Sequence, residues 1–472
     1  MVDVAEDGMR YVVAAVLSLL VCVGPVRAAE KGLPVADLSA VRVLDMSTAQ
    51  AIALAANPSM TAARARVEQA RERVSQAAAA WWPSLDLSGG ASRQRLAESG
   101  TLFDPSMAAL LAGTTDRNLE VYSAGLQATW VLFDGFYRRF RELQAEYDEQ
   151  SAVAGLVDSR RLLVRAVAEA FLNAQLAQTN TGISQADETF YLRQLEDAEN
   201  RYNVGVGPWG DILNIKVQLN TARTGLLRSQ REFEAAGYGL AALMGLPEAR
   251  FPERVRLQKQ DQQTNLFAPI GDADTLIQEA QATRPDIRRL EMTVRGAEAA
   301  TGMARAPFYP RLRAAGTVEG AREGDPGLSD ENFGNTIGLQ LSWNLYAGGA
   351  DQARLAEAKQ ARREAAATKA GLHNEVAGEI RRDLALLASA DEQVRLQRET
   401  VALVEENREL AKNEYDAGES PLIRLNEAQR DLVATYGRLA LALAARDLAA
   451  QRLLAATGRN LAGFDAPAGD RR

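Results

Sequence analysis

The chain contains an internal sequence duplication, and this duplication limits the folds that it can adopt. Residue types and their spacing match between the two halves at two different sequence offsets. The second offset holds without a gap from Leu126 to Gly245. The paired landmarks are Asn57-Pro58 with Arg284-Pro285, Trp81-Trp82-Pro83 with Phe308-Tyr309-Pro310, residues 126–135 with 339–348, and Met244-Gly245 with Thr457-Gly458. We therefore expect a fold built from two similar units.

The offset between the two halves changes between Pro83 and Trp130, because the first half has more residues there. We therefore expect a longer loop at this place in the first repeat. Each repeat is expected to contain a helix, two strands, a long helix, a tight tip and a further helix. The predicted division is a first repeat over 29–247, a connector over 248–271 and a second repeat with a short C-terminal tail over 272–472.

The first residues have the pattern of a secretory signal peptide over 1–28. Arg10 precedes an apolar run over 11–23, and a cleavage site that ends in a small residue follows at Val26-Arg27-Ala28. The run is too short for a permanent membrane helix. The pattern leaves open whether the chain starts at Met1 or Met9. Lipidation of Cys22 is disfavoured by Val21, and cleavage after Ala28 would leave an exported chain without cysteine.

Composition excludes most kinds of chemistry. The chain has one histidine, His373, and one cysteine, Cys22, so it cannot assemble ordinary His/Cys metal sites or Cys-His and Ser-His-Asp catalytic sets. Its 54 basic and 62 acidic residues give a net charge of −8, which is the wrong balance for a nucleic-acid groove. We expect no catalytic residue, no metal and no cofactor. The remaining enzyme alternative uses carboxylates only, with Asp211 or Glu427 as the residues to test.

Around each aromatic-proline landmark the apolar residues recur with a period of two, which is typical of strands. The alternating apolar positions are Leu85 and Leu87; Tyr122, Ala124, Leu126, Ala128, Trp130 and Leu132; Leu312, Ala314, Gly316 and Val318; and Ile337, Leu339, Leu341, Trp343 and Leu345. The polar positions between them include Gln127, Thr129, Gln340 and Ser342.

Each expected strand is about ten residues long, which suffices to cross a membrane when the strand is tilted. Aromatic residues gather near the strand ends, where a girdle at the membrane boundary would place them. The candidate girdle residues are Trp81, Trp82, Trp130, Phe308, Tyr309 and Trp343. The alternative interpretation is a soluble four-stranded sandwich with tryptophan in its core.

Elsewhere the apolar spacing is heptad-like and indicates long helices. The two sets are Ile212, Ile215, Leu219, Ala222, Leu226 and Phe233, and Val376, Ile380, Leu384, Leu387, Val394 and Val401. No proline interrupts 136–202, so we expect a rod of roughly 100 Å there.

Four strands cannot close a barrel, and an open edge in lipid leaves backbone groups unpaired. Several copies must therefore pool their strands. Two copies give about eight strands and three give about twelve, and we favour three because eight strands leave almost no lumen.

Residues 205–210 match G-x-G-x-x-G, but a long helix precedes them and Pro208 removes one backbone N–H, so we reject a dinucleotide site. The better interpretation is a turn between antiparallel helices, with Gly205 or Gly418 ending the first helix and Pro208 or Pro421 starting the second. From these residues alone, a plain hairpin turn without further role remains the alternative.

The chain resembles the TolC family of outer-membrane export ducts over nearly all of its expected mature length. The markers are Asn57-Pro58 with the helix that follows, Trp130 to Gly135, Arg201-Tyr202-Asn203-Val204-Gly205, and Leu243-Met244-Gly245. The resemblance implies a mainly helical protein with membrane β structure. It would form a homotrimer with a 12-stranded β-barrel in the Gram-negative outer membrane, four strands from each chain. A long α-helical barrel would continue across the periplasm.

The same resemblance implies a passive gated exit duct of a tripartite efflux pump or a type I secretion system, with partners that are a periplasmic adaptor and an inner-membrane pump. The tips that would dock on the adaptor are Val204, Gly205 and Val206, and Ala417, Gly418 and Glu419. The substrate cannot be read from the sequence, and drugs, metals and polypeptides all stay open. The rival function is a periplasmic coiled-coil scaffold without a channel.

The family's periplasmic mouth implies a gate at Asp211, Tyr415 and Glu427. Arg424 departs from the pattern, since an acid often occupies that position. An arginine there would either pair with Asp211 or Glu427 and hold the mouth shut, or weaken a ring that attracts cations.

Overall fold

The computed structural model describes residues 38, 41–95, 118–252, 254–260, 271–324 and 326–464. The predicted signal peptide over 1–28, including Cys22, lies outside the described residues. So do residues 96–117, which contain most of the longer loop expected in the first repeat.

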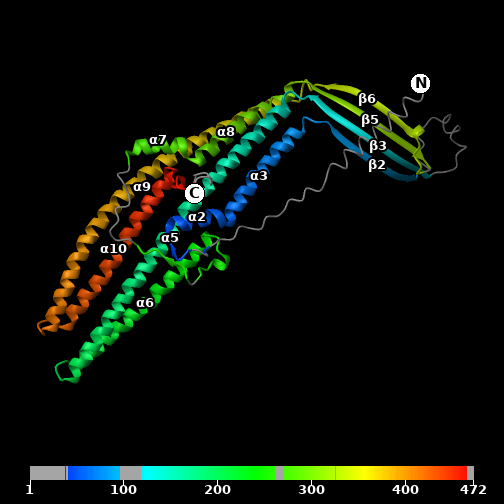
Figure 1. Cartoon of the computed structure of the whole chain (residues 1–472). Helices are drawn as coiled ribbons and strands as arrows, with labels where there is room; N and C mark the ends of the chain where they lie inside the picture. The colour runs from blue at the N-terminus through cyan, green and yellow to red at the C-terminus, as the bar shows by residue number, and fades with distance from the viewer. Residues whose placement is uncertain are drawn as a thin grey trace, which may run out of the picture. The chain divides into compact units, whose positions relative to one another are not determined.

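Four strands form one antiparallel sheet in the order β2-β3-β5-β6 (Figure 1). Their bounds are Ser84–Arg95 for β2, Asn118–Phe133 for β3, Arg311–Glu323 for β5 and Phe333–Ser342 for β6. The period-two prediction is therefore confirmed, although the strands run from 10 to 16 residues. A register shift between Val131 and Phe133 lets the longest strand, β3, stay paired with β5 to its end.

The sheet has one apolar and one polar face. Leu87, Leu126 and Val318 lie side by side in register on the apolar face, and Ser88, Gly125 and Glu319 lie on the polar face. The apolar face is open, and the side chain of Ile337 is 90% exposed. The sandwich alternative is therefore wrong for the described residues, because no second sheet covers these side chains.

Helices make up the rest of the two repeats. The first contains α2 (Met46–Ala56), α3 (Pro58–Ala79), α5 (Tyr137–Asn203) and α6 (Trp209–Leu243), and the second contains α7 (Ala273–Thr283), α8 (Pro285–Met303), α9 (Ala350–Asp416) and α10 (Leu422–Ala456). The rods α5 and α9 have 67 residues each, about 100 Å at 1.5 Å per residue. Most of the predicted heptad positions are buried, and only Leu384 and Phe233 are partly exposed.

The helix expected before the strands is preceded in each repeat by a short additional helix, and the two are separated at Asn57-Pro58 and at Arg284-Pro285. The residue before each proline makes the same contact with the end of the last helix. The Asn57 amide donates to the Leu243 carbonyl at 2.7 Å, and the Arg284 guanidinium donates to the Ala456 carbonyl at 2.8 Å. The duplication therefore extends from sequence landmarks to individual hydrogen bonds.

Short elements complete the fold. The two-residue strands β1 (Val43–Leu44) and β4 (Arg256–Leu257) pair in parallel, so part of the connector between the repeats joins the first repeat. Four 3₁₀ turns occur among the described residues, namely η1 (Pro247–Ala249), η2 (Ala306–Phe308), η3 (Asp330–Asn332) and η4 (Arg459–Leu461). The largest apolar core lies here, where α2, α5 and α6 pack with Leu44 and Leu257.

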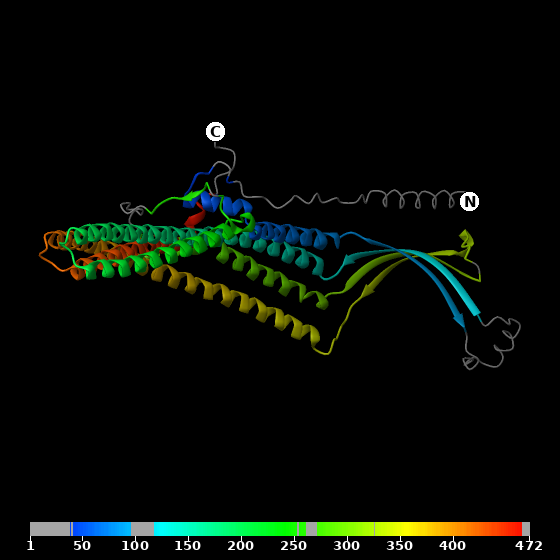
Figure 2. The same cartoon turned by 90° about the horizontal axis from the view of Figure 1, so that it is seen from below.

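The long elements form a layer that is four elements wide at each level (Figure 2). Near the tips the contacting neighbours run α6-α5-α10-α9, and nearer the sheet they run α3-α5-α8-α9. The sheet repeats this arrangement with β2-β3-β5-β6. The first repeat therefore supplies one edge of the layer throughout, and the second repeat supplies the other.

No helix among the described residues combines the length and the apolar character needed to cross a bilayer.

Candidate functional site at the helix tips

The first tip is a helix ending that glycine makes possible. Gly205 has φ +80°, and this left-handed conformation turns the chain so that Val206 N donates to Arg201 O at 2.9 Å and Gly205 N donates to Tyr202 O. Pro208 then precedes the first residue of α6, where a missing N–H costs nothing.

The second tip has the same construction. Gly418 has φ +77°, Glu419 N donates to Glu414 O at 2.9 Å, and Pro421 precedes α10. The predicted turns between antiparallel helices are therefore confirmed. The G-x-G-x-x-G segment lies between two helices rather than after a strand, which removes the structural basis for a dinucleotide site.

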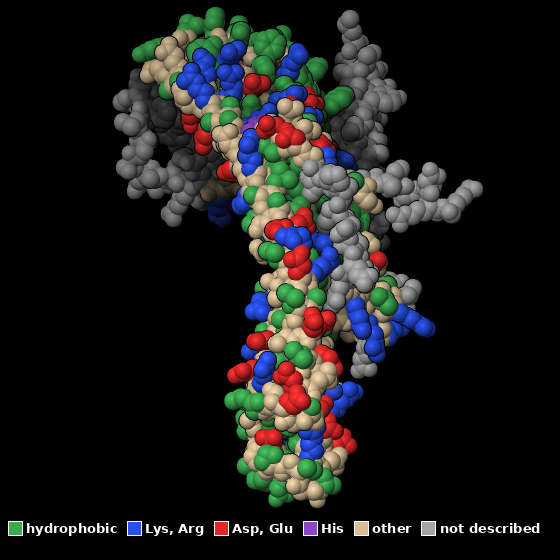
Figure 3. All heavy atoms as spheres, turned by 90° about the vertical axis from the view of Figure 1, so that its left-hand side faces the viewer, with side chains coloured by type: hydrophobic (Ala, Val, Ile, Leu, Met, Phe, Trp, Pro, Cys, Tyr) green, Lys and Arg blue, Asp and Glu red, His purple; other side chains and the backbone are tan. Residues whose placement is uncertain are grey.

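The two tips present different surfaces. At the first tip Val204 is 75% and Val206 is 79% exposed, and the rings of Tyr202 and Trp209 lie 5.3 Å apart beside them. The second tip exposes Ala417, Gly418 and Glu419. In Figure 3, which faces the tip side, the lower extremity is mostly hydrophobic and uncharged, and charged side chains of both signs cover the helices above it.

The two tips are joined by a contact that the sequence analysis missed. The Arg201 guanidinium pairs with the Asp416 carboxylate at 2.7 Å and lies 5.1 Å from the centre of the Tyr415 ring. A signal existed in the duplication, because Arg201 aligns with Glu414 and the repeats carry opposite charges at that position.

The predicted gate residues are brought together only in part. The Tyr415 hydroxyl donates to the Asp211 carboxylate at 3.4 Å, and burial, followed by the negative charge of Asp211, raises the pKa of Tyr415. Arg424 pairs with Glu414 at 3.8 Å, so within this chain its partner is neither Asp211 nor Glu427. Glu427 is exposed one turn further along α10.

Above the tips the two helical hairpins pack through aromatic and aliphatic side chains. Tyr191 and Ile212 of the first hairpin form a buried cluster with Leu422 of the second. Beside it the Gln429 amide donates to the Asp187 carboxylate at 2.9 Å. Burial raises the pKa of Asp187, and burial together with the charge of Asp187 raises the pKa of Tyr191 to about 12.

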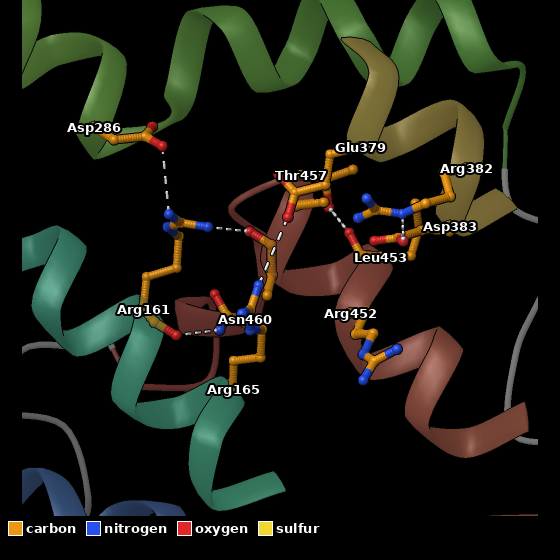
Figure 4. A network of polar contacts seen from close by, with 12 residues as sticks. Arg161, Arg165, Asp286, Glu379, Arg382, Asp383, Arg452, Leu453, Thr457 and Asn460 are labelled. Carbon is orange, nitrogen blue, oxygen red and sulfur yellow. Dashed lines mark hydrogen bonds and ion pairs between the residues drawn. The ribbon is translucent and has the colours of Figure 1, made fainter. Parts of the chain in front are cut away.

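A continuous chain of ion pairs joins α5, α8, α9 and α10 at the far end of the hairpins. Figure 4 shows one of these pairs, between Arg161 and Asp286. The successive pairs are Asp158–Arg161, Arg161–Asp286, Asp286–Arg284, Arg284–Glu379, Glu379–Arg165, Arg165–Glu169 and Glu169–Arg452. We call this set the junction network.

Burial alone would raise the pKa of Asp286, but the guanidinium groups of Arg284 and Arg161 outweigh it and hold that pKa below its usual value. Arg161 also donates to the Ala455 carbonyl at 2.9 Å, next to the bond from Arg284 to Ala456. The junction network therefore fixes the end of α10 to both repeats.

The six candidate girdle residues all lie at the end of the sheet that joins the helices. The Trp130 indole donates to the Trp81 carbonyl at 3.0 Å, and the Trp81 indole donates to Glu142 at 2.8 Å. The Arg138 guanidinium lies 4.5 Å from the centre of a Trp81 ring. Trp81 therefore contacts α5 through Glu142 and Arg138, and Trp130 contacts the backbone just before β2.

The described part of the chain holds no group of three or more His, Cys, Asp or Glu side chains that could bind a metal ion. What these residues form is a set of exposed tips and contacts between helices.

The comparisons agree with this architecture. A family model described as outer membrane efflux protein matches residues 51–246 and 276–459, one block in each repeat. The chain is 24% identical over 392 residues to the cation efflux system protein CusC of Escherichia coli K12, which covers 81% of this chain and 79% of CusC. It is 25% identical over 383 residues to nodulation protein T of Rhizobium leguminosarum bv. viciae, covering 80% and 76% of the two chains.

Among solved structures, the open state of the Neisseria gonorrhoeae MtrE outer membrane channel superposes with a TM-score of 0.72 at 21% identity, over 91% of this chain and 95% of that chain. The matching family consists of channels, not enzymes. The chain therefore belongs to the outer membrane efflux protein family, the TolC-like channels that lie in the Gram-negative outer membrane and extend into the periplasm.

Proposed function

We propose that this chain forms the passive, gated exit duct of a tripartite efflux pump or a type I secretion system. Residues 1–28 direct export, repeats 29–247 and 272–472 flank the connector 248–271, and the mature chain assembles as a homotrimer. The single observation that carries the proposal is that the four-element layer has two unpartnered edges at every level.

The sheet supplies the first pair of edges. Within the described residues β2 pairs only with β3, and β6 pairs only with β5. Because unpaired backbone groups are costly in lipid, β2 of one copy is expected to pair with β6 of the next. Three copies then close a 12-stranded barrel, with the apolar face toward lipid and the aromatic girdle at its helical end.

The helices supply the second pair of edges. Along α6, Leu213, Val217 and Leu227 are exposed, and along α9, Leu396, Leu403 and Leu410 are exposed at heptad spacing. These stripes lie on the two outer helices of the layer near the tips. Contact between α6 of one copy and α9 of the next would cover both stripes and continue the barrel as a helical tube.

The tips are proposed to dock on a periplasmic adaptor that leads to an inner-membrane pump. The first tip offers apolar contact through Val204 and Val206 around Gly205, and the second offers Ala417, Gly418 and Glu419. Trp209 adds a half-exposed ring to the first tip, so we assign it to the docking surface as well.

The gate is proposed to be the set of contacts that hold the two hairpins together at the tips. The Tyr415 hydroxyl on Asp211 and the Arg201 guanidinium on Asp416 link the hairpins within one chain. Arg424 and Glu427 lie on the exposed side of α10, where copies would face one another around the mouth.

The test is the conductance of the purified protein in a planar lipid bilayer. The proposal predicts discrete current steps from a water-filled pore. A preparation that is folded by circular dichroism and inserts but never conducts, even after the tip contacts are removed, would favour the rival scaffold without a channel.

A further inference from the structure

The polar face of the sheet carries charged side chains whose signs separate along the strands. Arg311 and Arg313 lie at the helical end of β5, and we call them the basic belt. Farther along β5, away from the helices, lie Glu319 and Glu323, which we call the acidic belt.

The strand register places the two belts on one face. Arg311, Arg313, Glu319 and Glu323 are all odd-numbered positions of β5, and alternate residues of a strand share a face. Asp86 is on the same face, because it pairs with Gln127, which pairs with Thr317, but it lies near the helical end of β2 and belongs to neither belt. A side chain added at Gly125 would meet Ser88 Oγ at 3.1 Å and Glu319 Cβ at 3.5 Å, so Glu319 stands on the same side as the small polar residues.

The belts are too far apart to neutralise each other. Arg313 and Glu319 are six positions apart along β5, which is about 20 Å in a strand. The screening length in physiological salt is about 8 Å. None of the ion pairs among the described residues involves a side chain of either belt.

We propose that the barrel lumen carries a basic ring at its helical end and an acidic ring in its outer half, and that these residues set its charge preference. This inference rests on the proposed function, in which three copies close the barrel with the polar face inward. A water-filled pore concentrates solutes of the sign opposite to its wall charge, by about threefold per unit charge for each kT of potential.

The order of the rings defines the class of solute that passes most easily. An anion is attracted by Arg311 and Arg313 and then repelled by Glu319 and Glu323, and a cation meets the reverse order. A solute of net zero charge, whether uncharged or zwitterionic, meets no net barrier at either ring. The barrel therefore favours net-neutral solutes over ions of either sign.

Single engineered thiols measure the two local potentials. Cys22 is the only cysteine in the chain, so a Cys22→Ala background has none. In that background Gln340→Cys reports on the basic belt, because Gln340 is the register partner of Arg313. Ser88→Cys reports on the acidic belt, because it lies level with Gly125 and Glu319. The probes are methanethiosulfonate reagents that carry either a sulfonate or a trimethylammonium group.

The expected result is a higher ratio of anionic to cationic reaction rates at Gln340→Cys than at Ser88→Cys. A difference of one kT between the belts gives about a sevenfold difference in that ratio, measured in roughly 10 mM salt. The difference should collapse in about 1 M salt, where the screening length falls to about 3 Å. Equal ratios at the two positions in low salt would overturn the proposal.

Charge-removing variants identify the residues responsible. The double variant Arg311→Gln and Arg313→Gln should lower the ratio at Gln340→Cys and leave Ser88→Cys unchanged. The control is Arg93→Gln, which removes one positive charge from the apolar face of the sheet, on β2, and should change neither ratio. A shift by the control as large as that by the double variant would contradict the assignment to the basic belt.

A thiol on the apolar face separates this inference from the proposed function. Leu339→Cys should be protected from both charged reagents, because the proposed function places Leu339 against lipid. If it reacts as fast as Gln340→Cys, or if Gln340→Cys does not react, the closed barrel is wrong. If Leu339→Cys is protected and the charge ratios are equal, only the charged rings are wrong.

Discussion

At the scale of single residues, the two repeats make the same contact with different side chains. Asn57 and Arg284 occupy equivalent positions before a proline, and each donates to the last turn of its repeat. The amide does so without a charge. The guanidinium is only 5% exposed and needs Asp286 and Glu379 beside it to remain buried. The second repeat is therefore more sensitive to charge at this point.

Removal of Arg284 should be strongly destabilising. Arg284→Met keeps the length of the side chain but leaves the buried Asp286 carboxylate with one guanidinium fewer, at a cost of about 3–5 kcal/mol. The control is Arg288→Met on the same helix, which breaks an exposed pair with Glu291 worth less than about 1 kcal/mol. Thermal unfolding followed by circular dichroism measures both variants. Equal melting temperatures for the two would show that the junction network contributes little.

Two buried aspartates should respond to neutralisation in opposite ways. The pKa of Asp286 is lowered in the fold, so its ionised form stabilises the protein above its usual pKa of 3.8, and this stabilisation is lost as pH falls through the lowered value. The pKa of Asp187 is raised by burial, so its ionised form is disfavoured in the fold, and protonation relieves this cost as pH falls.

At pH 7 we therefore expect Asp286→Asn to lower the melting temperature and Asp187→Asn to leave it unchanged or raise it. The asparagine at 187 retains an oxygen that accepts the Gln429 hydrogen bond. Asp187→Asn should approach the parent protein below the usual aspartate pKa, and Asp286→Asn should do so only once the pH has also fallen below the lowered pKa of Asp286, because each carboxylate is then protonated in both the folded and the unfolded state. A destabilised Asp187→Asn at pH 7 would contradict this account of its burial.

At the scale of elements, the two hairpins are held differently along their length. The junction network fixes α9 and α10 to α5 and α8 through buried charges. At the tips the Arg201–Asp416 pair is about one-third exposed, and such pairs contribute little to stability. Local separation is therefore easiest at the tips, which is where the proposed gate lies.

Weakening the tip contacts should open the duct without unfolding it. Arg201→Gln removes the pair with Asp416 and the contact with the Tyr415 ring, and Tyr415→Phe removes the hydrogen bond to Asp211. Each should raise the conductance of single channels in a planar bilayer, and the double variant should raise it most. The control Arg231→Gln breaks an exposed pair within α6 and should leave conductance unchanged. Unchanged conductance in the double variant would exclude these contacts as a gate.

The sequence predicted long-range order better than local charge pairing. Periodicity identified the four strands and the 67-residue rods because many residues contribute to each signal. It missed β1 and β4, which are only two residues long, and the short helices α2 and α7. It also missed the partners of Arg201 and Arg424, because a single charged residue has no period that would indicate which distant helix it meets.

At the scale of the whole molecule, one feature links the sheet and the helices. Every level of the layer ends in the first repeat on one side and in the second repeat on the other. Contacts of this kind between copies are heterologous, so they must close into a ring or continue without end. The proposed closure with three copies would satisfy the strand edges, cover the apolar stripes of α6 and α9 and provide a lumen.

The most direct test of this central claim is the mass of the mature chain extracted from outer membranes, measured by light scattering with the detergent contribution subtracted. The account predicts a particle of three chains that requires detergent to remain in solution. A monomer or dimer, or a protein that stays in solution without detergent, would contradict the shared barrel and with it the duct.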